Sequence, residues 1–576
     1  MKNSKRIISA IMALGMMAGC CACNNNNSQS GKTIVKIVNY EGGYGVDWLY
    51  EAKERFQVEN SNIVLDINTT KTPNASTMNS SASDLYFGGQ GDNPRMFAQK
   101  GWLASIDDIV NEKYDTRDGK KISIADKIDE SFQTILKGAD GKFYGLPYPE
   151  YYGGLSYDAD FFDKENLYIA DPVENGTNTD ADLSPWEAFG ITTNFISHKA
   201  AKKSCGADGK YGTFDDGMPT SLTEFLVLCD KIKNDVGATP LTMSGASYSY
   251  IALLINGLEA SLSGYEEMRA SYDFKGSVTY VSGYTDEAIF DGIDYIKKPE
   301  TAKAEIDCKT NGYLTTQTVA RYYTDALIEI ADKEGWYSKD FKKGTASNLD
   351  AQGNFIASGL NGIEKTAMLI EGSYWFTEAL ENNKMEDYKK LSGGKTERNV
   401  KWMPLPVTID KPILKEEDAK ERVLMSSAIR CFAFINARTE KKPAVLKACK
   451  EFLKFLYSDE ELAKYTANSG IIKASMTYPV SDEDLSGLSI FQKSVLEVKR
   501  NSRVVSSVSD NATFLANYTD FASSSSNVKN MPMIKSGVNN VHYPTVTKAL
   551  DAGYGTETIF ESTMITKENW AKYYKG

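Results

Sequence analysis

A glycine-rich acidic loop, CGADGKYGTFDDGMP at 205–219, places three aspartates close together in the chain. The carboxylates of Asp208, Asp215 and Asp216 are hard oxygen ligands, and the glycines permit the sharp turns that a calcium site needs. The loop does not follow the EF-hand spacing of aspartates, a central glycine and a distal glutamate. The sequence therefore allows a structural Ca²⁺ ion here, and the alternative is a solvated loop built from turn residues.

Other side chains that commonly do chemistry are few. The chain has only two histidines, His198 and His542, so histidine-ligated metal sites are not expected and a Ser-His or Cys-His triad would have few candidate bases. Of the eight cysteines, three lie at 20–23 and five lie further along without forming a C-x-x-C pair: Cys205, Cys229, Cys308, Cys431 and Cys449. We therefore predict no zinc or redox motif, and no cofactor other than the possible calcium ion.

Nucleotides and nucleic acids are not expected as ligands. The turn YEGGYG at 40–45 follows a β-rich run, but the third glycine of the dinucleotide-binding pattern G-x-G-x-x-G is missing after Gly43 and Gly45. No P-loop G-K-[ST] follows the turn either. The net charge of -12 argues against nucleic acid as the main partner.

The N-terminus has the properties of an export signal. The first six residues include three with basic side chains, Lys2, Lys5 and Arg6. They precede an uncharged, mostly apolar run at 7–19, which is too short to span a hydrocarbon core of ~30 Å comfortably. We predict a lipoprotein signal peptide at 1–19, because the Ala-Gly pair before Cys20 resembles a bacterial lipobox. That resemblance implies a diacylglyceryl group on Cys20, followed by a hydrated, flexible tether at 20–32. The alternatives are a conventional signal peptide cleaved a few residues later and an uncleaved membrane anchor.

The elements that follow alternate between strand and helix. Compact apolar runs at 33–39, 62–70 and 83–89 predict strands. Between them, the segment 46–60 has apolar residues every four positions with charged residues between, as an amphipathic helix requires. The segment 93–106 is also helical in pattern. This order predicts a mostly parallel α/β layer.

Two later segments give clear helical patterns. The segment 221–235 opens with a Ser-x-x-Glu capping box and places Cys229 on its apolar face. The segment 443–470 predicts a helix pair, with Cys449 in the apolar stripe of the first helix and Gly470 ending the second. Both cysteines are therefore expected in the core.

Six segments resemble, in the same order, the maltose-binding-like class of extracellular solute-binding proteins that serve ABC importers. They lie at 35–60, 83–107, 141–163, 365–380, 401–407 and 432–470. The resemblance implies a two-lobe α/β fold of the type II periplasmic-binding-protein kind, with hinge strands and a ligand cleft between the lobes. Hinge closure on the ligand would then report occupancy to the transmembrane subunits of an ABC permease.

The resemblance also implies that the chain crosses between the lobes more than once. We expect 33–148 and 403–465 to form lobe 1, and 149–402 and 466–576 to form lobe 2, the last part including a C-terminal extension. The expected protein is a monomer at the extracellular face of the cytoplasmic membrane, held there by its lipid.

Ligands of this family are mostly carbohydrates, which bind by stacking on aromatic rings and by hydrogen bonds to carboxylates and amides. Trp375, after a Gly-Ser turn, matches the stacking aromatic of the family, with a core tryptophan as the alternative. Glu41 and Tyr44 lie in the first strand–helix loop, where open α/β sheets bind ligands. Gly89 and Gln90 lie at the equivalent end of the third strand.

Three further tyrosines are candidates for the cleft. Tyr151 and Tyr152 flank the first expected hinge crossing, and one of the two is expected to face the cleft. Tyr250 begins a helix near the cleft in family members, and core packing is its alternative role.

The sequence thus favours a carbohydrate-binding subunit of an ABC importer, for an oligosaccharide above all. We expect no enzymatic activity, because the order of hinge and lobe segments that the resemblance implies favours binding over catalysis. A surface-anchored glycoside hydrolase is the main alternative, because 77 acidic residues leave a catalytic carboxylate pair open. A lipoprotein that binds a peptide or another non-sugar ligand is the other alternative.

Overall fold

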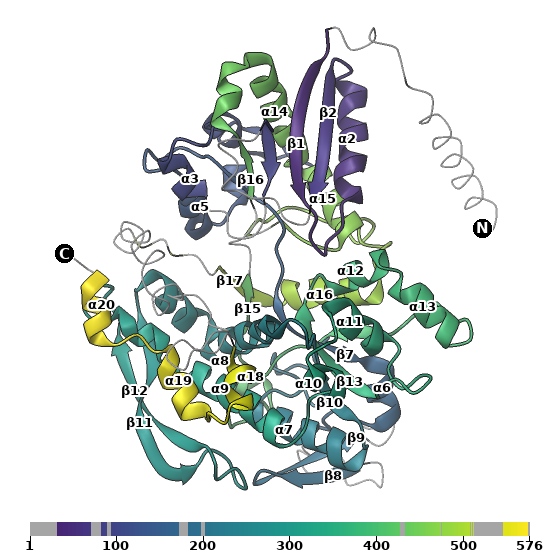
Figure 1. Ribbon diagram of the computed structural model, residues 1–576, viewed down its shortest axis with the longest axis vertical. Coiled ribbons are helices and arrows are strands. Elements are labelled where there is room, and N and C mark those ends of the chain that lie inside the picture. Colours follow the sequence, from purple (N-terminus) through teal and green to yellow (C-terminus); the bar gives the residue numbers. More distant parts are fainter. Residues whose placement is uncertain are drawn as a thin grey trace.

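The computed structural model describes residues 31–70, 82–88, 94–171, 183–196, 202–426, 432–473, 475–506, 509, 511 and 545–573. The predicted signal peptide, Cys20 and nearly all of the tether lie outside these residues, as do Gly89 and Gln90. Among the described helices, none combines the length and the hydropathy needed to cross a bilayer. The described chain forms two α/β lobes, one above the other in Figure 1, joined by extended crossings.

The smaller lobe, lobe 1, is built on a five-stranded sheet with the order β2-β1-β3-β16-β6. Strand β1 pairs in parallel with β2 and β3, as the sequence predicts, and β16 runs antiparallel to both of its neighbours. The strands are β1 (Thr33–Tyr40), β2 (Ile63–Thr70), β3 (Leu85–Phe87), β6 (Leu146–Pro147) and β16 (Phe432–Ile435).

Helices pack on this sheet through the apolar faces that the sequence predicts. Helix α2 buries Trp48 and Phe56 against the lobe 1 core, and α14 buries Cys449. The side chain of Ser458 accepts a hydrogen bond at the start of α15, and Gly470 ends it in the left-handed conformation at φ 70°. The helices are α2 (Asp47–Glu59), α3 (Pro94–Gln99), α4 (Asp107–Val110), α5 (Glu130–Leu136), α14 (Pro443–Leu456) and α15 (Asp459–Ser469).

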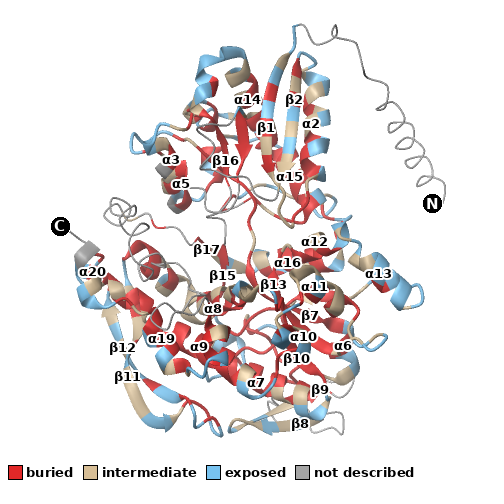
Figure 2. Cartoon of the chain, in the orientation of Figure 1, coloured by how far each residue is buried: buried red, intermediate tan, exposed pale blue. Residues whose placement is uncertain are grey.

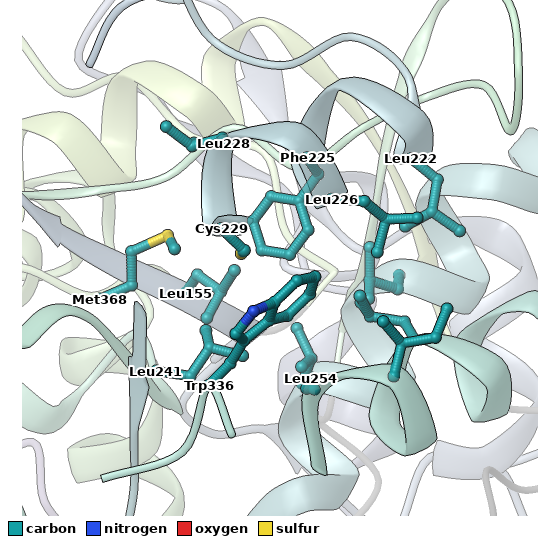
Figure 3. Close-up of a cluster of buried hydrophobic side chains, with 14 of the residues drawn as sticks. Leu155, Leu222, Phe225, Leu226, Leu228, Cys229, Leu241, Leu254, Trp336 and Met368 are labelled. Atoms are coloured by element: carbon teal, nitrogen blue, oxygen red, sulfur yellow. The ribbon is translucent and has the colours of Figure 1, made fainter. Parts of the chain in front are cut away.

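Lobe 2 surrounds a four-stranded sheet with the order β10-β13-β7-β14. Its strands are β7 (Gly153–Asp158), β10 (Thr239–Thr242), β13 (Thr366–Gly372) and β14 (Val400–Trp402). Every residue of β13 is buried. Figure 3 shows part of the core beside the sheet, where Trp336 lies among Phe225, Leu241 and Leu254, with Cys229 close by.

Helices cover both faces of this sheet, and two of the C-terminal helices, α18 and α19, pack on α9. The helices are α6 (Ala159–Glu165), α7 (Leu222–Asp230), α8 (Ile251–Asp273), α9 (Val319–Lys333), α10 (Lys339–Lys343), α11 (Asn348–Ile356), α12 (Trp375–Glu381), α13 (Lys384–Leu391), α16 (Ile490–Arg500), α18 (Val546–Asp551), α19 (Thr556–Thr563) and α20 (Lys567–Tyr573).

Four strand pairs lie outside the two main sheets. The hairpins of β8 with β9 and of β11 with β12 project from lobe 2 (Figure 1). Their members and those of the other pairs are β4 (Tyr114–Asp115), β5 (Lys121–Ile122), β8 (Leu183–Ala188), β9 (Ile191–Ile196), β11 (Ser277–Ala288), β12 (Lys297–Glu305), β15 (Arg422–Ser426) and β17 (Ser502–Ser506).

The lobes are connected where chain segments cross side by side. The first crossing, between β6 and β7, pairs through Tyr152 with Ser426 at the end of β15 and through Pro149 with Lys473, which follows α15. Buried residues continue through this region in Figure 2. Met403 and Leu405, which fall in the segment expected for lobe 1, pack instead in the core of lobe 2. The chain therefore returns to lobe 1 later than expected, on the way to β16.

Candidate functional site

A cavity of about 280 Å³ lies between the lobes, at the carboxyl ends of β1 and β13. Lobe 1 contributes the loop that follows β1, and lobe 2 contributes α12 and the start of α8, while Tyr151 comes from the first crossing. The residues that line it are Tyr40, Glu41, Gly42, Gly43, Tyr44, Tyr151, Tyr250, Tyr374, Glu378, Glu381 and Asn382. Most of these side chains are aromatic or acidic, which suits recognition of a small polar molecule.

Gly43 lets the two lobes approach closely at this cavity. A Cβ atom on Gly43 would lie 2.5 Å from Cδ2 of Tyr374 and 3.3 Å from Cβ of Glu378. Such a distance is well inside van der Waals contact, so a side chain at this position would push the loop of lobe 1 away from α12 of lobe 2. Gly43 and Gly45 therefore allow this turn to lie against lobe 2, where a Cβ on Gly45 would lie 2.5 Å from Oε1 of Glu381.

The tyrosine rings around the cavity meet at steep angles. The rings of Tyr151 and Tyr374 are 5.2 Å apart with an interplanar angle of 85°. On the lobe 1 side, Tyr44 packs edge-on between Tyr40 and Tyr148, with centroid distances of 6.2 Å and 5.9 Å. The hydroxyl of Tyr148 in turn donates to Asn39 in β1 at 2.8 Å. The aromatic walls of the cavity are thus held by packing within each lobe.

A buried carboxyl group lies behind the lobe 2 wall. Glu371, at the end of β13, accepts hydrogen bonds from Nε2 of Gln352 at 3.0 Å and from the backbone N–H of Gly372 at 2.9 Å. The same Nε2 of Gln352 donates to Oε2 of Glu378 at 2.7 Å, and Nδ2 of Asn348 donates to this oxygen at 3.1 Å. This network fixes Glu378 on the cavity wall.

Burial and these carboxylates shift the pKa values of their neighbours. Loss of solvation, together with the charge of Glu378, raises the pKa of Glu371 to about 8, against the opposing effect of its hydrogen-bond donors. The pKa values of Tyr250 and Tyr374 are also raised, first by burial and then by the charge of Glu371. Both phenols therefore stay protonated at neutral pH.

The raised pKa of Glu371 predicts a pH-dependent stability. At pH values between 4.5, the ordinary pKa of this side chain, and about 8, the folded protein keeps a proton on Glu371 that the unfolded chain releases. Stability from this group is therefore lost as the pH rises, at about 1.4 kcal/mol per pH unit. We expect the free energy of unfolding of the wild type to fall, relative to Glu371→Gln, by about 2 kcal/mol between about pH 6 and about pH 7.5.

Urea unfolding of both proteins at each pH measures this difference. Glu386→Gln, on the exposed side of α13, is the matched control and should keep the pH dependence of the wild type. Parallel curves for the wild type and Glu371→Gln would show that Glu371 is ionised in the folded protein.

The structure brings four of the predicted binding residues to the cavity: Glu41, Tyr44, Tyr151 and Tyr250. Two predictions were wrong in position. Trp375 is fully buried, and its Nε1–H donates to Oγ of Ser156 at 2.8 Å. Tyr152 is buried as well, and its hydroxyl donates to Glu150 in the crossing. Tyr151 is therefore the tyrosine of this pair that faces the cleft, and Trp375 is the core tryptophan of the alternative interpretation.

Helical periodicity marks the cavity residues that sequence reasoning missed. Residues 374, 378, 381 and 382 recur at the spacing of one helix face, and they are Tyr, Glu, Glu and Asn. The opposite face carries Trp375, Phe376 and Ala379, which are all buried. Treating the segment after the Gly-Ser turn as a helix would have placed Tyr374 and Trp375 on different faces, without deciding which of the two faces the cavity.

The acidic loop at 205–219 is not arranged as a calcium site. Nη2 of Arg422 lies 2.8 Å from Oδ2 of Asp215, and both side chains are buried. Asp216 and Asp208 accept backbone N–H groups of the loop itself, from Gly212 and Lys210. Across the described residues, no group of three acidic, cysteine or histidine side chains could hold a metal ion. A guanidinium thus supplies the positive charge that the sequence suggested for Ca²⁺.

The fold matches solved structures of solute-binding proteins over nearly the whole chain. A chitin oligosaccharide binding protein matches with a TM-score of 0.53 and 13% identity over 95% of this chain and 100% of that chain. A manno-oligosaccharide specific solute binding protein from Bifidobacterium animalis subsp. lactis, in complex with mannotriose, matches with a TM-score of 0.52 and 13% identity over 95% of this chain and 96% of that chain. RafE in complex with raffinose matches with a TM-score of 0.51 and 12% identity over 94% of this chain and 100% of that chain. These similarities confirm the predicted fold.

Comparison by sequence adds no relative. No protein-family model matches the chain, and no curated protein matches it either.

Proposed function

We propose that this protein is the solute-binding subunit of an ABC importer and captures a carbohydrate, above all an oligosaccharide, between its two lobes. The lipidated Cys20 would hold it at the extracellular face of the cytoplasmic membrane, where the closed, loaded form would dock on the permease. The observation that carries the proposal is the cavity lined by tyrosines and carboxylates between two lobes that share their crossings. Aromatic rings suit the C–H faces of sugars, and carboxylates and amides accept or donate to sugar hydroxyls.

The solved structures of similar fold support a saccharide ligand. The ligands named for the matching structures are chitin oligosaccharide, mannotriose and raffinose, which are all short saccharides. We propose binding without catalysis, as a monomer. The glycoside hydrolase, with its two carboxylates at a defined separation, remains the alternative that the experiment must exclude.

A thermal-shift screen of the purified protein against short saccharides tests the proposal. A ligand at 100 times its Kd adds about 2.7 kcal/mol to the stability, which raises the melting temperature by a few degrees. We expect such a shift with at least one saccharide, with the saccharide recovered intact. Release of reducing ends would favour the hydrolase, and the absence of a shift with every saccharide would overturn the proposal.

The variant Gly43→Ala tests whether ligand binding depends on the contact between the two lobes. We expect Gly43→Ala to weaken ligand binding by about tenfold or more, because its methyl group would collide with the ring of Tyr374 when the lobes meet. Gly487→Ala is the matched control, since a Cβ there meets no atom within 4 Å. Calorimetric titration of both variants measures the effect, and equal affinities would show that this contact does not contribute to binding.

A further inference from the structure

The charges around the cavity all have one sign. Glu41, Glu378 and Glu381 line it, and none of the described residues that line it is lysine, arginine or histidine. Elsewhere in the described chain, carboxylates are commonly paired: Asp84 lies 2.9 Å from Nζ of Lys442, for example. A lining whose charged side chains, among the described residues, are all carboxylates favours a ligand that carries a positive charge.

Two of these carboxylates keep acceptor capacity in the described structure. The amides of Asn348 and Gln352 both donate to Oε2 of Glu378, while its Oε1 has no partner among the described residues. The carboxylate of Glu41 likewise takes part in no hydrogen bond or ion pair within the described part of the chain. Neutral amides therefore hold Glu378 in place without neutralising its charge.

The ring geometry also suits a cation. The only tryptophan of α12 is in the core, so the aromatic rings that line the cavity are those of tyrosines. Tyr151 and Tyr374 pack edge to face at 85° to each other, so that their rings form a corner. Ammonium groups bind to such ring faces by cation–π attraction, which strengthens when water is excluded.

We propose that the ligand of this cavity carries a protonated primary amine, and that it is an amino sugar with a free amino group, alone or within an oligosaccharide. The ammonium group would lie in the corner formed by the rings of Tyr151 and Tyr374 and would donate to Glu378 and Glu41. This inference rests on the proposed saccharide-binding function and specifies the substrate class. Uronic acids and other anionic sugars would be repelled by the same carboxylates.

Calorimetric titration with matched ligands tests this inference. The probes are a glucosamine trisaccharide, its fully N-acetylated counterpart, a uronic acid trisaccharide and the polyamine spermidine, all at about pH 6. We expect the free-amine trisaccharide to bind at least tenfold more tightly than the N-acetylated one, and the uronic acid not to bind. Raising NaCl from about 20 mM to about 300 mM should reduce this preference, because salt screens the attraction.

Variants of α12 and α13 identify the group responsible. Glu378→Gln should lose most of the preference for the free amine and keep the binding of the N-acetylated sugar. Glu386→Gln, exposed on α13 and paired only with a surface lysine, should keep the full preference. Equal or tighter binding of the N-acetylated sugar to the wild type would overturn the inference and leave the proposed function intact. Binding of spermidine but of no saccharide, or binding of none of the four probes, would also overturn the inference, and the thermal-shift screen with the other saccharides would then decide the proposed function.

Discussion

Replacing Trp375 by alanine is expected to lower the free energy of unfolding by about 3–5 kcal/mol, the usual cost of removing a fully buried tryptophan. The indole packs against Phe355, Phe376 and Phe491, with ring centroids 5.9, 5.4 and 5.2 Å away. Its loss would leave a large cavity in this cluster and would also leave Oγ of Ser156, which is buried, without the indole N–H. The effect is on folding, because the indole does not reach the interlobe cavity.

The neighbouring residue should behave in the opposite way. Tyr374→Ala is expected to abolish measurable binding of the ligand, while its cost in stability should be smaller, because this side chain is only half-buried at the cavity wall. Urea unfolding and calorimetric titration of both variants separate the two effects. At a temperature where Trp375→Ala remains folded, its ligand affinity should lie within a few-fold of the wild type. If the Trp375→Ala protein were stable but no longer bound the ligand, Trp375 would have to be part of the binding site.

Trp375 and Tyr374 also show which features of the protein could be predicted from its sequence. Local patterns predicted the strand β1, the helix α2 and the buried positions of Cys229 and Cys449, because periodicity and capping depend on nearby residues. They could not decide which of two adjacent aromatics points into the cleft, since one position along a helix turns a side chain by about 100°. That choice depends on the cluster around Phe491, which comes from a distant part of the chain.

The acidic loop was misjudged for a similar reason. The spacing of Asp208, Asp215 and Asp216 describes only the loop, whereas the partner of Asp215 is Arg422, on a strand of the hinge region. Nothing near the loop in the sequence reveals that a guanidinium will lie beside it. The later return to lobe 1 has the same cause, because Met403 and Leu405 follow β14 into the lobe 2 core before the chain crosses.

Breaking the ion pair of Asp215 and Arg422 is the second change with a large expected effect. Both side chains are almost completely buried, and Asp215 also accepts hydrogen bonds from the N–H of Ala207 at 2.8 Å and from Oγ1 of Thr213 at 3.0 Å. Asp215→Ala would leave the guanidinium of Arg422 buried without its counter-ion. We expect this variant to lose about 3–5 kcal/mol of stability in urea unfolding.

Two further variants and a calcium titration distinguish the contribution of the ion pair to stability from those of the loop's own hydrogen bonds and of bound calcium. Asp216→Ala removes a carboxylate that bonds only within the loop, so we expect a loss of about 1 kcal/mol. Combining Asp215→Leu with Arg422→Met removes both charges and should recover much of the stability, because no charge is then left buried alone. Neither Ca²⁺ nor a chelator should shift the unfolding midpoint of the wild type. The reason is that a guanidinium 2.8 Å from the carboxylate of Asp215 opposes the binding of a second cation there. If Ca²⁺ stabilised the wild type and this effect disappeared in Asp215→Ala, the loop would be a calcium site.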